Sequence, residues 1–489
     1  MKIHTATKQS AWLLHRGALA LARMTANGVR IDVGYLDAQI ESVKAEIAEI
    51  ERKLANDRIW ERMQRSFGHK AKITSGEQLG VVVFDHMGYK RGRSLNKKDR
   101  REEAWFKKPK YDEAAFSNCD LDFVKAFFRR KKLEKLLTTY FYDIKRNLVG
   151  DRIHPFFHLN RIISYRSSCS DPNVQNLVNR NKEIAQRLRR CFIPDPGCVF
   201  VDWDYSGAEV RSACCYTKDP RLIRDFTQEG TDPHGDTIAQ ILGVDKKRFA
   251  GKGVPEEVVK RWKSGPRDVG KNRFVFPQFF GSTYHNCGPH IWEVFERGMM
   301  LPDKSMLILE HLKLQGITEL GDPEDVPQPH QFLYRVKKVE ESFWDDRFTV
   351  YRDWKRREWD FYTKNGYCQS LSGFVYTGLL SKNEVLNLRV QGFAFHWNLL
   401  SLIEMQDRID EEKMPVRFWN EVHDNSVSNV GEKFVNEFCD RMKEVMEVLP
   451  GKKWDVSVPL SAEVEIAPGG GAWSEKKVYT RGSRGWVAK

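Results

Sequence analysis

Residues 198–211 read Cys-Val-Phe-Val-Asp-Trp-Asp-Tyr-Ser-Gly-Ala-Glu-Val-Arg. The apolar and β-branched start of this stretch predicts a strand that ends on Asp204. The Ser-Gly pair marks a turn, after which a helix is predicted. A carboxylate at the end of a strand projects into the space above the sheet, where a cation can be bound.

A second aspartate follows another predicted strand, at 416–422, which delivers His423, Asp424 and Asn425 at a turn. Two carboxylates from neighbouring strands can hold two Mg²⁺ ions about 3.5–4 Å apart, as in phosphoryl and nucleotidyl transfer. Asp204 and Asp424 are therefore candidate catalytic metal ligands. Either aspartate alone is more commonly a cap or a turn residue, so the pair gains meaning only together with other residues.

Two cationic residues could act together with this pair. Arg267 and Lys271 are four positions apart on a predicted helix, so both point from one face. An arginine fork and a lysine together can grip the phosphates of a triphosphate and stabilise the leaving pyrophosphate. An ordinary solvated basic face is the alternative. No G-x-x-x-x-G-K-[ST] loop occurs, so a P-loop ATPase is not supported.

Composition sets wider bounds. The 489 residues suggest about three domains. The formal charge of +13 suits a polyanionic partner, although a merely soluble basic surface would look the same. Nine scattered cysteines include no C-x-x-C pair, which predicts reduced thiols in a cytoplasm. We find no signal peptide and no bilayer-spanning stretch, and so expect no membrane association.

Along the chain, apolar periodicity predicts helices at 12–26, 34–55 and 121–147. Residues 60–112 are irregular and basic, which predicts an exposed tip. Strands are predicted at 152–163, 198–204, 416–422 and 456–466, with a mostly helical block between the second and third. We expect the basic tail after Trp473 to be flexible.

These segments carry a specific resemblance. Residues 204–211 resemble the first catalytic motif of family A (DNA polymerase I-like) DNA polymerases, and residues 422–424 resemble the last one. Residues 267–281 are similar to the nucleotide-gripping helix of the family's fingers, and 166–176 to its template-primer-binding segment. The similarity runs from about 12 to 475 in the family's order. Within it, Lys-Asn-Arg-Phe-Val-Phe-Pro-Gln-Phe-Phe-Gly at 271–281 looks more like the bacteriophage members.

The resemblance implies an α+β fold of the right-hand polymerase type, in which an antiparallel palm sheet carries a large helical fingers insertion. The expected domains are a thumb at 12–150 with its basic tip at 60–112, a palm at 151–214 and 415–475, fingers at 215–414 and a basic tail at 476–489. A segment at about 289–325 has no identified family counterpart.

The resemblance also implies roles for individual residues. Asp204, Asp424 and the carbonyl of Tyr205 would bind two Mg²⁺ ions, for which Mn²⁺ can substitute. Glu209 would fill the space of a ribose 2′-OH and so favour deoxynucleotides. The nucleotide is expected to contact Arg267, Lys271, His234, Glu209, Tyr205, Phe276 and Phe280. Primer-template DNA is expected to contact Arg166, Asn173, Gln175, Asn176, Gln391 and His423.

The implied activity is a DNA-directed DNA polymerase that extends a primer from deoxynucleoside triphosphates, as a monomer in the cytoplasm of a bacterial or virus-infected bacterial cell. No exonuclease is expected in this chain. A separate exonuclease or processivity factor on 60–112 or 289–325 is left open. Two alternatives remain: a single-subunit RNA polymerase-like palm enzyme, which Glu209 disfavours, and a non-catalytic nucleic-acid-binding relic, which would tend to lose the metal carboxylates.

Several positions depart from the family pattern. Phe276 and Phe280 follow Lys271 by five and nine residues, one more than the family's spacing. On a straight helix Phe276 would lie about 140° from Lys271, so we predict a one-residue π-bulge between them. The alternative is a straight helix that presents Val275 and Phe279. Small Gly207 and Ala208 should enlarge the pocket under the new base pair, and Asn425 replaces an acidic residue.

Overall fold

The computed structural model describes residues 7–91, 111–178, 181–228, 230–483 and 485–489. These residues form two compact units, each built from segments far apart in the sequence. The first comprises Met1–Ser42, Leu136–Thr231 and Phe348–Lys489, and the second comprises Val43–Lys135 and Asp232–Arg347. Residues 92–110 of the predicted basic tip at 60–112 lie outside the described residues.

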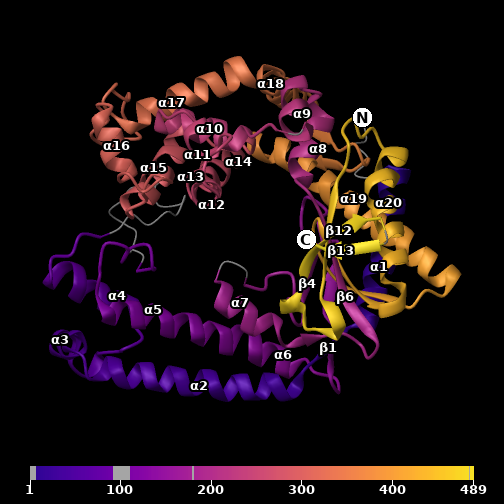
Figure 1. Ribbon diagram of the computed structural model, residues 1–489, viewed down its shortest axis with the longest axis horizontal. Coiled ribbons are helices and arrows are strands. Elements are labelled where there is room, and N and C mark those ends of the chain that lie inside the picture. The colour runs from indigo at the N-terminus through magenta and orange to yellow at the C-terminus, as the bar shows by residue number, and fades with distance from the viewer. Residues whose placement is uncertain (1–6, 92–110, 179–180, 229, 484) are drawn as a thin grey trace. The chain divides into compact units, whose positions relative to one another are not determined.

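A six-stranded antiparallel sheet organises the first unit (Figure 1). Its central strand β6 buries Val199, Phe200, Val201 and Trp203, as its apolar sequence predicts. In spatial order the strands are β13 (Gly485–Ala488), β12 (Lys477–Gly482), β11 (Ala462–Ile466), β6 (Cys198–Tyr205), β10 (Asn425–Gly431) and β9 (Val416–Val422).

Helices pack on this sheet and on one another. The long helix α19 (Lys382–Glu412) begins with a capping box of Ser381 and Glu384 and is buried along most of its length. It contacts α1 (Lys8–Asn27), α8 (Ala208–Thr217), α20 (Val435–Lys453) and strand β10. The remaining elements of this unit are β1 (Val29–Ile31), β2 (Arg152–Ile153), β3 (Phe156–His158), β4 (Ser168–Ser170), β5 (Phe192–Ile193), β7 (Tyr367–Gln369), β8 (Val375–Thr377), α6 (Tyr142–Arg146), α7 (Lys182–Arg189), α9 (Pro220–Thr227) and α18 (Thr349–Asn365).

The second unit is helical. In its first segment, Phe116, Phe123, Phe127 and Phe128 form part of a buried aromatic core. Helix α2 (Val33–Ala55) runs into this segment from the first unit. The other helices are α3 (Arg58–Phe67), α4 (Gly76–Gly80), α5 (Asp122–Lys135), α10 (Pro233–Leu242), α11 (Lys247–Ala250), α12 (Glu256–Ser264), α13 (Pro266–Val269), α14 (Phe276–Phe279), α15 (Tyr284–Glu296), α16 (Ile308–Leu314) and α17 (Phe332–Ser342).

The predicted helices are confirmed as α1, α2 and the run of α5, a π-helical turn at Leu136–Phe141 and α6. Two predicted strands are wrong in extent. The stretch 152–163 holds only the short β2 and β3, and Pro155 between them has no amide hydrogen to donate. Similarly, 456–466 is a strand only from Ala462 onward, after Pro459.

The expectation of a flexible tail is also wrong. Residues after Trp473 form β12 and β13, which extend the six-stranded sheet next to β11. Trp486 packs edge-on against the buried Trp203, with ring centroids 5.5 Å apart. The tail has alternating apolar residues, as a strand does, but its many basic residues led us to expect a flexible segment. The nine cysteines are free thiols, as predicted. No described helix has the length and apolarity needed to cross a bilayer.

Candidate active site

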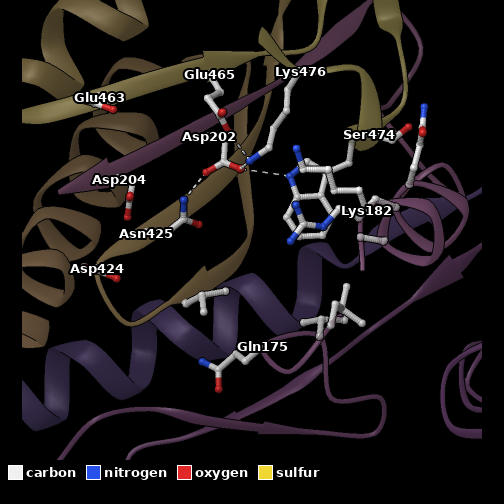
Figure 2. Close-up of a pocket in the computed structure, with 17 residues that line it drawn as sticks. Gln175, Lys182, Asp202, Asp204, Asp424, Asn425, Glu463, Glu465, Ser474 and Lys476 are labelled. Atoms are coloured by element: carbon white, nitrogen blue, oxygen red, sulfur yellow. Dashed lines mark hydrogen bonds and ion pairs between the residues drawn. The ribbon is translucent and has the colours of Figure 1, made fainter. Parts of the chain in front are cut away.

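The two predicted metal ligands lie beside each other in the first unit. Strand β6 places Asp204 opposite Asn425 of β10, and a two-residue turn of His423 and Asp424 joins β9 to β10. The amide of Tyr205 donates to the carbonyl of Asp424 at 3.0 Å, which ties the two strand ends together. His423 occupies the left-handed region with φ of 64°, as a tight turn requires. Both carboxylates line one cavity (Figure 2). Its volume is about 690 Å³.

The electrostatics of this pair favour a bound cation. Burial, and then the charges of Asp424 and Asp202, raise the pKa of Asp204 to about 8. Burial also raises the pKa of Asp424, against the opposing effects of its own backbone amide and Arg166. The site therefore holds two neighbouring carboxylates whose repulsion a divalent ion would relieve.

The donor set fits Mg²⁺. Among the described residues, no group of three or more His, Cys, Asp or Glu side chains is arranged to hold a metal. Mg²⁺ is commonly held by one or two carboxylates together with substrate phosphates and water, so Asp204 and Asp424 suffice as its protein carboxylates. The carbonyl of Tyr205 remains a candidate third ligand.

The side chain of Tyr205 does not serve the predicted purpose. We expected Tyr205 to contact the nucleotide, but its ring is buried, and its hydroxyl donates to the carbonyl of Met446 at 2.8 Å. The same hydroxyl lies 3.1 Å from Oγ of Ser401. A ring fixed in this way anchors the strand end rather than closing over a substrate, so a role for the side chain is wrong.

Glu209 lies in the first turn of α8, close to Arg166. Burial raises the pKa of Glu209, while Arg166, whose Nη1 is 3.4 Å from Oε1, acts to lower it. Gly207, just before α8, has a φ of 64°, a conformation that glycine adopts without strain. A Cβ at Gly207 would meet no atom within 4 Å, in line with the open pocket expected there.

The predicted DNA-binding segment, 166–176, is linked by hydrogen bonds to the turn of His423 and Asp424, which we call the metal turn. Nε2 of Gln175 donates to Oγ of Ser167 at 2.8 Å and to Oε1 of Glu421 at 2.8 Å. Oε2 of Glu421 accepts the amide of His423 at 3.0 Å. The fully buried Glu421, which the sequence analysis missed, thus joins Gln175 to the turn. Burial raises its pKa to about 7.

The other predicted DNA contacts have different surroundings. Oδ1 of Asn173 accepts the amides of Gln175 and Asn176, both at 3.1 Å, and so shapes the loop. Burial and then Arg166 lower the pKa of His423 to about 4, so its imidazole is neutral near pH 7. Gln391 is partly exposed on α19.

The residues of the predicted nucleotide-gripping helix lie in the second unit, whereas Asp204 and Asp424 lie in the first. A π-helical turn, Gly270–Val275, joins α13 to α14, so the predicted π-bulge is confirmed. Nζ of Lys271 lies 5.4 Å from the ring centroid of Phe276. The alternative of a straight helix presenting Val275 and Phe279 is wrong, because both are buried.

His234 and Arg267 complete this group. The His234 ring lies 5.5 Å from the Phe276 ring, and Nε of Arg267 donates to Oδ1 of Asp232 at 2.8 Å. Burial, followed by the charges of Arg267 and Lys271, lowers the pKa of His234 to about 4. Phe276 and Phe280 line a cavity of about 300 Å³. Four residues that the sequence analysis assigned to the nucleotide therefore lie close together in this unit: His234, Arg267, Lys271 and Phe276.

The cavity beside Asp204 also holds residues that were not predicted. Asp202 accepts hydrogen bonds from Asn425, Lys476 and Trp473, the last at 3.1 Å (Figure 2). Asp202 could have been found, since residues two apart on a strand share a face. No pattern in the sequence pointed to Lys476.

The sequence and the fold are similar to those of known DNA polymerases. The sequence model of DNA polymerase family A matches residues 36–253. The chain is 27% identical over 462 residues to a thermostable DNA polymerase I of Thermus thermophilus, covering 91% of this chain and 46% of that protein. It is 22% identical to DNA polymerase I of Pseudomonas aeruginosa, over 93% of this chain and 43% of that protein. The chain thus spans just under half the length of these relatives.

A solved structure extends the likeness to the fold. The POL domain of Pol1 from M. smegmatis, in complex with DNA primer-template and dNTP, superposes with a TM-score of 0.65 at 19% identity. The match covers 94% of this chain and 70% of that one. It confirms the predicted fold class, whereas the domain boundaries and the bacteriophage-like subgroup stay predictions.

Proposed function

Because the sequence model of DNA polymerase family A matches residues 36–253 and the chain is similar to bacterial DNA polymerase I, we propose that it is a family A DNA-directed DNA polymerase that extends a primer from deoxynucleoside triphosphates. The observation that supports this most is the pair Asp204 and Asp424 at two adjoining strand ends, bearing carboxylates whose mutual repulsion a divalent ion would relieve. Two Mg²⁺ ions, or Mn²⁺ in their place, are the proposed cofactor.

Bound metal would supply a lowered pKa at the primer 3′-OH and neutralisation of the phosphate charge. The chain's own residues do the rest. Asp204, Asp424 and the Tyr205 carbonyl fix the metal positions, while Arg267 and Lys271 hold the triphosphate and stabilise the leaving pyrophosphate.

Selection of the sugar is assigned to Glu209, whose half-buried carboxyl would occupy the space of a 2′-OH. The proposed primer-template contacts are Arg166, Gln391 and His423, with His423 oriented through Glu421 and Gln175. Contacts to phosphates should weaken steeply with salt and carry little sequence preference. The chain would work as a monomer in the cytoplasm of a bacterial or virus-infected cell.

Primer extension by the purified chain tests the proposal. We expect each templated deoxynucleotide to be added in the order set by the template, with ribonucleotides added far more slowly. Primer-free synthesis from ribonucleotides would instead indicate an RNA polymerase-like enzyme. Tight DNA binding without any extension would indicate a relic. A labelled mismatched primer should stay intact, since no exonuclease is proposed in these residues.

A further inference from the structure

Four carboxylates form a ladder on one face of the six-stranded sheet. Strand register places Asp204 directly opposite Glu463, and Asp202 directly opposite Glu465. Asp202 and Asp204 share this face because they are two residues apart on β6. Like charges directly opposite one another destabilise a sheet, so both pairs need a counter-charge.

In the part of the chain that the structure describes, ion pairs with a lysine form within only one of the two pairs, although the charge of Lys476 also acts to lower the pKa of Asp204 from farther away. The ammonium group of Lys476 contacts Asp202 and lies 2.6 Å from Oε2 of Glu465, bridging these two carboxylates (Figure 2). Among the described residues, no lysine or arginine forms an ion pair with Asp204 or Glu463. The pair that includes the catalytic aspartate is thus left open to a metal ion.

Lys476 is held firmly in place. Burial acts to lower its pKa, but the charges of Asp202 and Glu465 and their hydrogen bonds raise it overall, so it stays charged. Trp473, three residues earlier, donates its indole hydrogen to Asp202 at 3.1 Å and packs against Trp419. Strand β12 begins at the next residue, Lys477, and fixes the backbone on the other side.

Asp202 is also hydrogen-bonded to the residue that follows the metal turn. Its Oδ1 accepts from Nδ2 of Asn425, the residue directly after Asp424. The asparagine amide is therefore turned with its nitrogen toward Asp202. Without Lys476, the buried Asp202 would keep the hydrogen bonds from Asn425 and Trp473 but would lose its ion pair, next to the residue that follows the metal ligand.

We propose that Lys476 is an internal counter-ion, which neutralises the Asp202–Glu465 pair and thereby reserves the divalent ions for Asp204 and Asp424. Lys476 is a positioning residue in this role, and the inference rests on the proposed polymerase function. Without its ammonium group, Asp202 and Glu465 would form a competing site for a divalent ion beside the catalytic one.

Binding of Mn²⁺ to the metal-free protein, counted by electron paramagnetic resonance without DNA or nucleotide, tests the inference. Lys476→Met is expected to bind one more Mn²⁺ ion than the wild type. Lys477→Met, which removes the exposed neighbouring ammonium, should bind the wild-type number. Asp202→Asn with Lys476→Met should return to the wild-type number, since the competing carboxylate is gone. An unchanged number and affinity in Lys476→Met would overturn the proposal.

Two further measurements cover a loss of folding and a loss of function. If Lys476→Met does not fold, the double variant should fold, because it removes both charges; failure of both variants would overturn the proposal. Single-nucleotide insertion by Lys476→Met at limiting Mg²⁺ should fall by about 10- to 100-fold, as for partners of metal ligands elsewhere, and Lys476→Arg should restore it. A wild-type chain that extends no primer would refute the polymerase, whereas the Mn²⁺ count would still decide the role of Lys476.

Discussion

Replacing Asp204 by Asn should stabilise the metal-free protein. Burial and the charges of Asp424 and Asp202 raise the pKa of Asp204 from 3.8 to about 8. Between these values the folded protein holds a proton that the unfolded chain has released, so the free energy of unfolding falls as the pH rises from 3.8 toward 8. Because Asp204 is an exposed residue, solvent screens these charges, so we expect a loss at pH 7 of about 1 kcal/mol rather than the full 1.4 kcal/mol or so per pH unit.

Urea unfolding in EDTA, across the interval between the two pKa values, measures this loss. Asp204→Asn cannot titrate, so it should gain up to the full loss at pH 7 and show a flatter pH dependence than the wild type. Glu411→Gln, at an exposed position on α19, is the matched control and should behave as the wild type. A less stable Asp204→Asn with the wild-type pH slope would refute the electrostatic reasoning.

Divalent ions should reverse the order of stability. A ligand that binds only the folded state stabilises it by about 2.7 kcal/mol at a concentration one hundred times its dissociation constant. The wild type should therefore gain stability on addition of Mn²⁺, and Asp204→Asn should gain much less. An equal gain in both proteins would show that the ion binds elsewhere.

Three further outcomes are expected. Lys271→Ala should slow single-turnover insertion by about 100-fold or more, because it removes a charge that stabilises the leaving pyrophosphate; a change confined to DNA affinity would contradict this. Glu209→Ala should reduce the preference for deoxynucleotides over ribonucleotides by about tenfold or more, measured as the ratio of kcat/KM values, and an unchanged ratio would remove Glu209 from sugar selection. Glu421→Ala should cost about 1 to 3 kcal/mol in urea unfolding, because it removes the carboxylate that accepts from Gln175 and from the amide of His423, and should also weaken primer-template binding; wild-type values for both would refute its joining role.

Local patterns carried the sequence predictions that the structure confirms. Asp204 and Asp424 were found because each ends or follows an apolar strand, and pairing of β6 with β10 brings them together. The π-helical turn after Lys271 was predictable because one extra residue must be absorbed before Phe276 can face the same way. Both inferences rest on the fixed geometry of strands and helices.

Contacts between distant segments could not be predicted in this way. Lys476 reaches Asp202 only because the tail pairs as β12 with β11, and a basic tail reads as solvated until that pairing is known. Tyr205 was assigned to the nucleotide by the resemblance to family A polymerases, but its ring points into the core beneath α19 and α20. Glu421 gave no signal, because a glutamate on a strand is ordinarily exposed.

The role of the aspartate pair is tested most directly by single-turnover insertion of a template-matched deoxynucleotide with Asp424→Asn, alongside primer-template affinity by fluorescence anisotropy. Loss of a metal ligand worth several kcal/mol of transition-state stabilisation predicts an insertion rate lower by about 1,000-fold, with DNA affinity little changed. An insertion rate close to that of the wild type, at equal DNA affinity, would contradict catalysis by metal ions held at Asp204 and Asp424.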